Sequence, residues 1–104
     1  MTQPLVVSLP HSLGKIEAIR RLKVGVTRVG LDYNRFIAIT EESWVDDRLV
    51  LQVVALTQHI RGQIDVGEDH IRIEILLPRL LAGTAKRLQP LLKQKGALML
   101  TSKR

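Results

Sequence analysis

The chain has 104 residues, enough for one domain and too few for two. An apolar content of 45% with 25% charged residues is typical of a folded chain and excludes a disordered or collagen-like one. Cysteine is absent, which excludes a disulfide framework, a thiolate nucleophile and a cysteine-based zinc site. We therefore expect a single domain over residues 1–104, with a globular core at about 4–95 and a C-terminal tail at 96–104.

The net charge of +6 is unevenly distributed along the chain. Residues 12–35 carry +4, residues 36–78 carry −5 and residues 79–104 carry +7, so a basic, an acidic and a basic segment follow one another. The first residues contain no basic stretch before their apolar run, and no run approaches the roughly 18 apolar residues of a membrane span. We expect a basic, cytoplasmic protein without a transmembrane segment.

The first elements are predicted to be a short strand and a long helix. An apolar run at Leu5–Leu9 is closed by Pro10, which cannot donate to a sheet, and this indicates a strand. Ser12 is the predicted N-cap of a helix that begins at about Leu13. Apolar residues then recur at spacings of three and four and predict one buried helical stripe, at positions 16, 19, 22, 26, 29, 33 and 36.

The end of this helix is left open by the sequence. Gly30 is a possible C-cap, and Asn34 offers a later one, which we favour. Four strands are expected next, each bounded by polar turns or glycine, at Ile37–Val45, Arg48–Leu56, Arg61–Val66 and His70–Leu76. Alternation predicts one inward face, which carries Leu49, Leu51, Val53, Ala55, Ile71, Ile73 and Ile75.

A second amphipathic helix is predicted from Pro78 to about Gly96, with Pro90 inside it. A short apolar tail at Ala97–Thr101 follows. The expected order is β-α-β-β-β-β-α. We therefore predict an α+β fold, in which two helices cover one face of a single antiparallel sheet.

No catalytic, cofactor-binding or metal-binding residue is assigned. The three histidines lie at spacings that match no metal site, and we place His59 in a loop and His70 on a solvated strand face. We expect His11 to be held by packing or a backbone hydrogen bond. Gly14 and Lys15 stand at a helix N-terminus, where an anion can bind, but they form no Walker motif. A functional role for His11 and Lys15 stays open.

The basic helices carry the main functional signal. We expect a partner-binding surface on their outer side, extended by the apolar tail with its cationic rim, which suits an amphiphilic or anionic surface. The candidate residues are Arg20, Arg21, Lys23, Arg28, Lys86, Arg87, Lys93, Lys95, Leu98, Met99 and Leu100. The alternative is that these charges only solvate the helices and partly neutralise the acidic turns.

Four stretches resemble one family of small bacterial proteins, in the order and spacing that the family shows. They read VVSLPHSLGKIEAIRRLK, EESWVDDRLVLQV, RGQIDVGEDHIRIEILLP and LLAGTAKRLQPLL. The most specific pieces are Pro10 to Leu13 before the helix, Trp44 with its acidic turn, and Gly62-x-Ile64-x-Val66. The chain resembles the polyhydroxyalkanoic acid system family from about Leu5 to Leu92. It departs from the pattern after Val45, where Asp46-Asp47 replaces a turn that commonly contains glycine.

The resemblance implies a link to the bacterial storage polyester polyhydroxyalkanoate, which is kept as cytoplasmic granules, and implies no catalytic residue or cofactor. We expect a non-catalytic accessory or binding protein whose partner is the granule surface or a protein of that system. One alternative is a nucleic-acid-binding module that uses the basic helices, since α-β-β-β-α order is shared with double-stranded RNA-binding domains. A small enzyme with an unrecognised site is a second alternative, and a homodimer is also possible.

Overall fold

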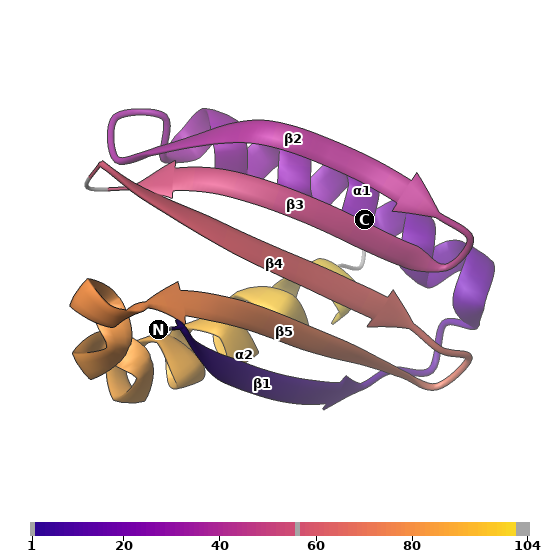
Figure 1. The fold of residues 1–104 in the computed structure, drawn as a ribbon. Coiled ribbons are helices and arrows are strands. Elements are labelled where there is room, and N and C mark those ends of the chain that lie inside the picture. The colour runs from indigo at the N-terminus through magenta and orange to yellow at the C-terminus, as the bar shows by residue number, and fades with distance from the viewer. Residues whose placement is uncertain (1, 56, 102–104) are drawn as a thin grey trace.

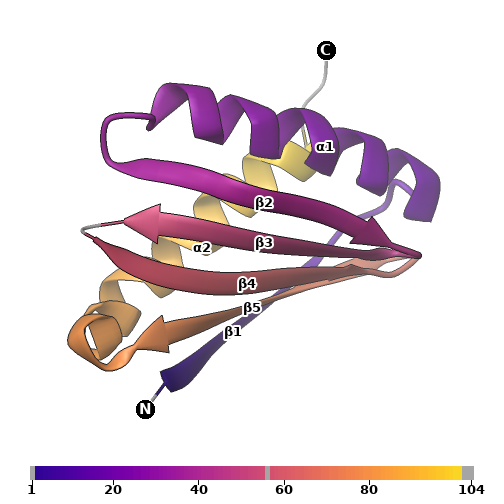
Figure 2. The same ribbon diagram turned by 45° about the horizontal axis from the view of Figure 1, so that its top comes forward.

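The computed structural model describes residues 2–55 and 57–101 (Figure 1). Five antiparallel strands form one sheet in the order β1-β5-β4-β3-β2. Two α-helices lie on one face of this sheet, as Figures 1 and 2 show. The predicted α+β class and the order β-α-β-β-β-β-α are confirmed. The elements are β1 Thr2–Pro10, α1 Lys15–Asp32, β2 Ile37–Val45, β3 Arg48–Ala55, β4 Gln58–Val66, β5 His70–Pro78, a 3₁₀ helix η1 Arg79–Thr84, and α2 Ala85–Thr101.

Strand β1 lies at one edge of the sheet and β2 at the other, so the chain must cross the sheet between them. Helix α1 makes this crossing and then runs alongside β2 (Figure 2). β1 alternates between buried Leu5, Val7 and Leu9 and exposed residues, as a strand covered on one face should. It is longer than predicted because it pairs with β5 along its whole length.

The hairpin of β2 and β3 contains two backbone irregularities. The register shifts between Ile39 and Glu41, a bulge that changes which residues of β2 face inward. The turn after Val45 has Asp46 at a φ of 54°, a left-handed conformation that aspartate tolerates better than most residues. The Asp46-Asp47 pair therefore makes a tight turn without glycine.

Strands β4 and β5 carry the clearest division between the two faces of the sheet. Ile71 and Ile73 are buried on the inner face, as predicted, while Arg72 and Glu74 point outward and lie 3.2 Å apart. Arg48 adds an ion pair of 2.6 Å to Asp65 across the outer face. β4 begins at Gln58, so His59 lies on a strand and the prediction of a loop there is wrong.

Helix α1 begins at Lys15, two residues later than predicted, and Ser12 is not its cap. Gly14 occupies the N-cap position with φ 78° and ψ 163°, a conformation open almost only to glycine. The helix ends at Asp32, between the two ends that the sequence allowed. Its buried stripe is Ala18, Leu22 and Val26, whereas Ile16 is 86% exposed and was wrongly placed on the stripe.

The C-terminal helix differs from the prediction at both ends. Pro78 does not begin a helix, because it is the last residue of β5 and pairs there with Thr2 of β1. The 3₁₀ helix η1 follows Pro78 and precedes α2. α2 continues through Gly96 to Thr101, and Leu100 is only 2% exposed. The predicted helix end at Gly96 is therefore wrong, and residues 97–101 are helical. Thr101 is the last described residue, so Lys103 and Arg104 lie outside the described part.

Gly96 allows α2 to pack closely on β1. A Cβ at this position would overlap Leu9 Cδ1 and come within 3.8 Å of Ile73 Cδ1. Both partners belong to the hydrophobic core, so neither can withdraw freely. The close approach explains why a glycine that helix propensity disfavours stands in the middle of α2.

We predict that Gly96→Ala destabilises the fold by about 1–3 kcal/mol, because overpacking against Leu9 outweighs the gain in helix propensity. Chemical denaturation followed by circular dichroism measures the change. Gly83→Ala is the matched control, since a Cβ at Gly83 meets nothing within 4 Å, and it should cost nothing. Equal stability of the two variants would contradict the close packing of α2 on β1.

Candidate functional site

The two helices border an open groove of about 500 Å³ on their outer side, which we call the outer groove. Helix α1 contributes three arginines and α2 contributes Lys95, so the walls are strongly basic. Apolar side chains lie between these cations, and Asp32 is the one acidic lining residue. The lining consists of Arg20, Arg21, Val24, Gly25, Arg28, Val29, Asp32, Tyr33, Lys95, Leu98 and Met99.

The helices touch where Gly25 of α1 meets Met99 of α2. A Cβ at Gly25 would stand 2.6 Å from both Cγ and Sδ of Met99, so only glycine allows this spacing without a shift of the methionine. The Val24-Gly25-Val26 stretch is a poor helix former by itself. Packing explains why this stretch is nevertheless helical, because Val26 is buried below the contact between Gly25 and Met99. Val24 lies beside the contact and is 57% exposed.

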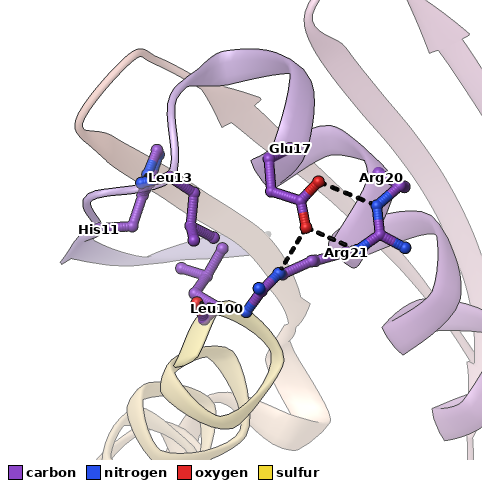
Figure 3. A network of polar contacts seen from close by, with 6 residues as sticks. All are labelled: His11, Leu13, Glu17, Arg20, Arg21 and Leu100. Atoms are coloured by element: carbon purple, nitrogen blue, oxygen red, sulfur yellow. Dashed lines mark hydrogen bonds and ion pairs between the residues drawn. The ribbon is translucent and has the colours of Figure 1, made fainter. Parts of the chain in front are cut away.

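Helix α1 carries a network of ion pairs close to the end of α2 (Figure 3). Glu17 accepts hydrogen bonds from Arg20 at 2.6 and 2.9 Å and from Arg21 at 2.8 Å. Arg21 also donates to the backbone oxygen of Leu100 at 3.2 Å. The last turn of α2 has no basic residue of its own, so this guanidinium supplies the positive charge that a helix C-terminus favours.

The same network shifts a pKa. Hydrogen bonds from Arg20, and then from Arg21, lower the pKa of Glu17 from 4.5 to about 2. Glu17 is therefore ionised over the whole physiological range. It partly neutralises two of the arginines. Within residues 2–55 and 57–101, Arg28 and Lys95 are the groove cations that have no carboxylate within 4 Å.

The outer groove brings together many of the candidate residues that the sequence singled out. Arg20, Arg21 and Arg28 come from α1 and meet Lys95, Leu98 and Met99 from α2. Lys95 Nζ lies 5.4 Å from the centre of the Tyr33 ring, within range of a cation–π contact. Leu98 is 58% exposed, which leaves an apolar side chain among the cations.

The other candidates lie elsewhere. Lys86, Arg87 and Lys93 are exposed on α2 but do not line the groove. Lys23 lies over the Trp44 ring, 5.5 Å from its centre, on the other side of α1. Leu100 is part of the hydrophobic core, so its assignment to an exposed contact surface is wrong, because α2 continues and turns this residue inward.

Five residues that line the groove were not among the predicted contact residues, namely Val24, Gly25, Val29, Asp32 and Tyr33. Tyr33 was counted on the buried stripe, although it lies at the C-cap of α1 and borders the groove. Val24 was passed over because it falls off the stripe, and an apolar residue off the stripe between cations was the available signal. Gly25 was not singled out either, and a glycine within a helical pattern could have indicated a close helix contact.

His11 has a structural role. Its Nδ1 accepts a hydrogen bond from the Leu13 backbone N–H at 3.1 Å, so the ring proton sits on Nε2, which donates to the Gly67 oxygen at 3.1 Å. The His11 backbone N–H also donates to the Asp69 oxygen at 2.8 Å. The predicted backbone hydrogen bond is confirmed, and His11 ties the start of α1 to the turn between β4 and β5.

Lys15 and its backbone amide are paired within the chain. The ammonium lies 2.9 Å from Asp47 Oδ2, and this hydrogen bond and charge raise the pKa of Lys15. The Lys15 backbone N–H donates to Glu68 Oε1 at 3.3 Å, so a carboxylate from the β4–β5 turn caps α1. An anion at this helix start would have to displace two carboxylates.

A second space lies on the inner side of the helices, between them and the sheet, and we call it the inner cavity. It has a volume of about 310 Å³. Strands β2 to β5 form its floor, and its walls are the C-terminal half of α1 and the middle of α2. Its lining is almost wholly aliphatic, and Lys95 and Gln63 are the polar exceptions besides the Tyr33 ring. No pattern in the sequence predicts this cavity.

Within residues 2–55 and 57–101, no group of three or more histidine, aspartate or glutamate side chains could hold a metal ion. In the same part of the chain no polar or charged residue is buried. No helix there is both long and apolar enough to cross a membrane.

One protein family matches most of the chain. The sequence model of the polyhydroxyalkanoic acid system protein family matches residues 5–97, which include both helices up to Ala97 and all strands from Leu5 onward. No curated protein and no solved structure matches the chain.

We predict that Glu17→Gln lowers the midpoint of thermal unfolding at neutral pH, because it removes the negative charge that pairs with both arginines. The pKa of this carboxylate is lower in the folded state, so its stabilisation is present above about pH 4.5 and disappears as the pH falls toward 2. The difference in midpoint from the wild type should shrink over that range. Glu42→Gln on β2 is the control, and a difference that persists at pH 2 would contradict the ion-pair explanation.

We predict that His11→Ala destabilises the fold by about 1–3 kcal/mol, since it leaves the Gly67 oxygen and the Leu13 amide without their partner. Urea denaturation measures the change. His70→Ala is the control, because the His70 side chain is exposed and its ring is bonded to the side chain of its neighbour Asp69. A His11→Ala protein of wild-type stability would show that the ring does not support the fold.

Proposed function

Because the chain belongs to the polyhydroxyalkanoic acid system protein family, we propose that it is a non-catalytic accessory protein that binds the surface of cytoplasmic polyhydroxyalkanoate granules. The observation that carries this proposal is the outer groove, in which exposed apolar side chains stand among cations. Leu98 and Val24 are more than half exposed there, and Arg28 and Lys95 lie beside them. A surface of this kind suits the boundary between an apolar polymer and an anionic or hydrated coat.

The non-catalytic part of the proposal is supported by how the titratable side chains are used. His11 is hydrogen-bonded to the backbone through both ring nitrogens, and Lys15 is paired with Asp47. Catalytic groups with shifted pKa values lie in clefts, where burial and charged neighbours act together, whereas the lowered pKa of Glu17 arises from two arginines on an exposed helix surface. These groups support the fold and leave the outer groove as the functional surface.

Cosedimentation with isolated polyhydroxyalkanoate granules tests the proposal. We expect purified wild-type protein to sediment with the granules, and the double variant Arg28→Glu with Leu98→Ser to lose at least tenfold in apparent affinity. Arg61→Glu is the matched control, because Arg61 is exposed on the opposite face of the sheet and gives the same change of charge.

Equal binding of the wild type, the double variant and the control would contradict the role of the outer groove. Absence of binding by all of them would contradict a granule partner. If the protein instead binds duplex RNA or DNA with an affinity that falls steeply as salt rises, the nucleic-acid alternative replaces the accessory role.

A further inference from the structure

The inner cavity is larger than the voids of an ordinary core. Protein interiors contain few spaces bigger than one water molecule, and sites for small molecules begin at roughly 300 Å³. The space of about 310 Å³ between the helices and the sheet is at that lower limit. Because an unfilled apolar space forfeits the dispersion contacts of every side chain around it, a ligand that fills it would gain those contacts.

Gly62 creates part of this space. It lies on β4 between Leu51 of β3 and Ile75 of β5, at an inward-facing position of the sheet. A Cβ built at Gly62 would stand at ordinary distances of 3.5 and 3.6 Å from the Glu74 oxygen and from Ile75 Cγ1. The backbone therefore has room for a side chain here, and its absence deepens the floor of the cavity.

The chemistry of the lining restricts what can enter. Its walls are isoleucine, leucine, valine and methionine side chains, so a sugar, nucleotide or peptide would bury polar groups without partners. An aliphatic chain loses nothing in such a place. A flexible, unbranched chain can also follow a space whose floor comes from four strands and whose walls come from two helices.

Lys95 marks where a charged end would lie. It is half-buried and lines both the inner cavity and the outer groove, together with Val29, Tyr33 and Met99. The groove beyond it carries Arg28 and the two arginines paired with Glu17, against the single acid Asp32. An anionic group next to Lys95 would enter a region of positive charge while its tail stays among apolar side chains.

We propose that the inner cavity binds a free fatty acid of medium chain length, with the aliphatic chain over Gly62 and the carboxylate at Lys95. This inference rests on the cavity and its charged border, and it stands whether or not the protein binds granules. The carboxylate contact gives orientation, and the apolar lining gives most of the affinity.

Isothermal titration calorimetry with decanoic acid, decanol and hexanoic acid tests the proposal, with no granules present. Decanoic acid should bind most tightly, because hexanoic acid fills less of the cavity and decanol lacks the charge. Lys95→Met should weaken the binding of decanoic acid by about tenfold or more and leave the affinity for decanol nearly unchanged. Lys93→Met is the matched control on the same helix, since Lys93 is exposed and lines neither space.

Gly62→Leu tests the place of the chain. It should abolish binding of decanoic acid while the thermal midpoint stays at or above the wild-type value, because the new side chain fills apolar space and glycine is unfavourable in a strand. Arg61→Leu is the matched control, since it adds the same side chain one residue away on the outer face. If Gly62→Leu does not fold, Val53→Phe fills the cavity from β3 instead.

Binding that survives both filling variants, or no binding of any of the three compounds, would overturn the proposal. Flotation with vesicles of an anionic phospholipid distinguishes binding of a free fatty acid from binding of a bilayer. Tight binding to vesicles without calorimetric binding of decanoic acid would also overturn the proposal. Size-exclusion chromatography with light scattering measures the oligomeric state. If the wild type is a dimer and Gly62→Leu is a monomer, a second copy of the chain covers the cavity.

Discussion

The contact between Gly25 and Met99 sets the distance between the two helices, and both candidate sites depend on that distance. A Cβ at Gly25 would lie only 2.6 Å from Met99 Cγ and Sδ, which shows how closely α2 approaches α1. The arginine network adds polar attachment at the end of α2, through Glu17, Arg21 and the Leu100 carbonyl. Above the contact lies the basic outer groove, and below it lies the apolar inner cavity. A wider spacing would merge these two environments and lose the separation of charge from apolar surface.

The opposite end of α1 is held by a different kind of interaction. The segment from Pro10 to Lys15 contains a histidine, a serine, a glycine and a lysine that suggest chemistry, and in the structure they join a helix to two hairpin turns. His11 bonds the β4–β5 turn, and Lys15 bonds Asp47 in the β2–β3 turn. The acidic middle of the sequence thus provides the carboxylates that bind Lys15 at the start of α1. Charge complementarity within the chain explains part of the basic, acidic, basic pattern.

Much of the fold could be predicted because its signals are local. Alternation located the inward faces of β3 and β5, and the turn at Asp46-Asp47 fixed the hairpin between β2 and β3 to the residue. The errors occurred where tertiary contacts override local preference. Gly96 reads as a helix end, yet α2 continues because the glycine packs on Leu9. Ser12 reads as a cap, yet the capping oxygen that accepts from the Lys15 amide comes from Glu68, 53 residues after Lys15.

The sequence by itself determined the fold class, the family and the basic character of the helices, because periodicity, order of elements and charge are properties of neighbouring residues. Only the tertiary structure decided which cations share a surface and where apolar space remains. Arg28 and Lys95 are distant in sequence and meet because α2 folds back over the sheet onto α1. In the sequence, Gly62 is only a residue that is unfavourable in a strand. In the structure it forms part of the floor of a cavity, because two helices pack over this part of the sheet. A cavity is defined by surfaces that long-range packing brings face to face, and no local pattern records it.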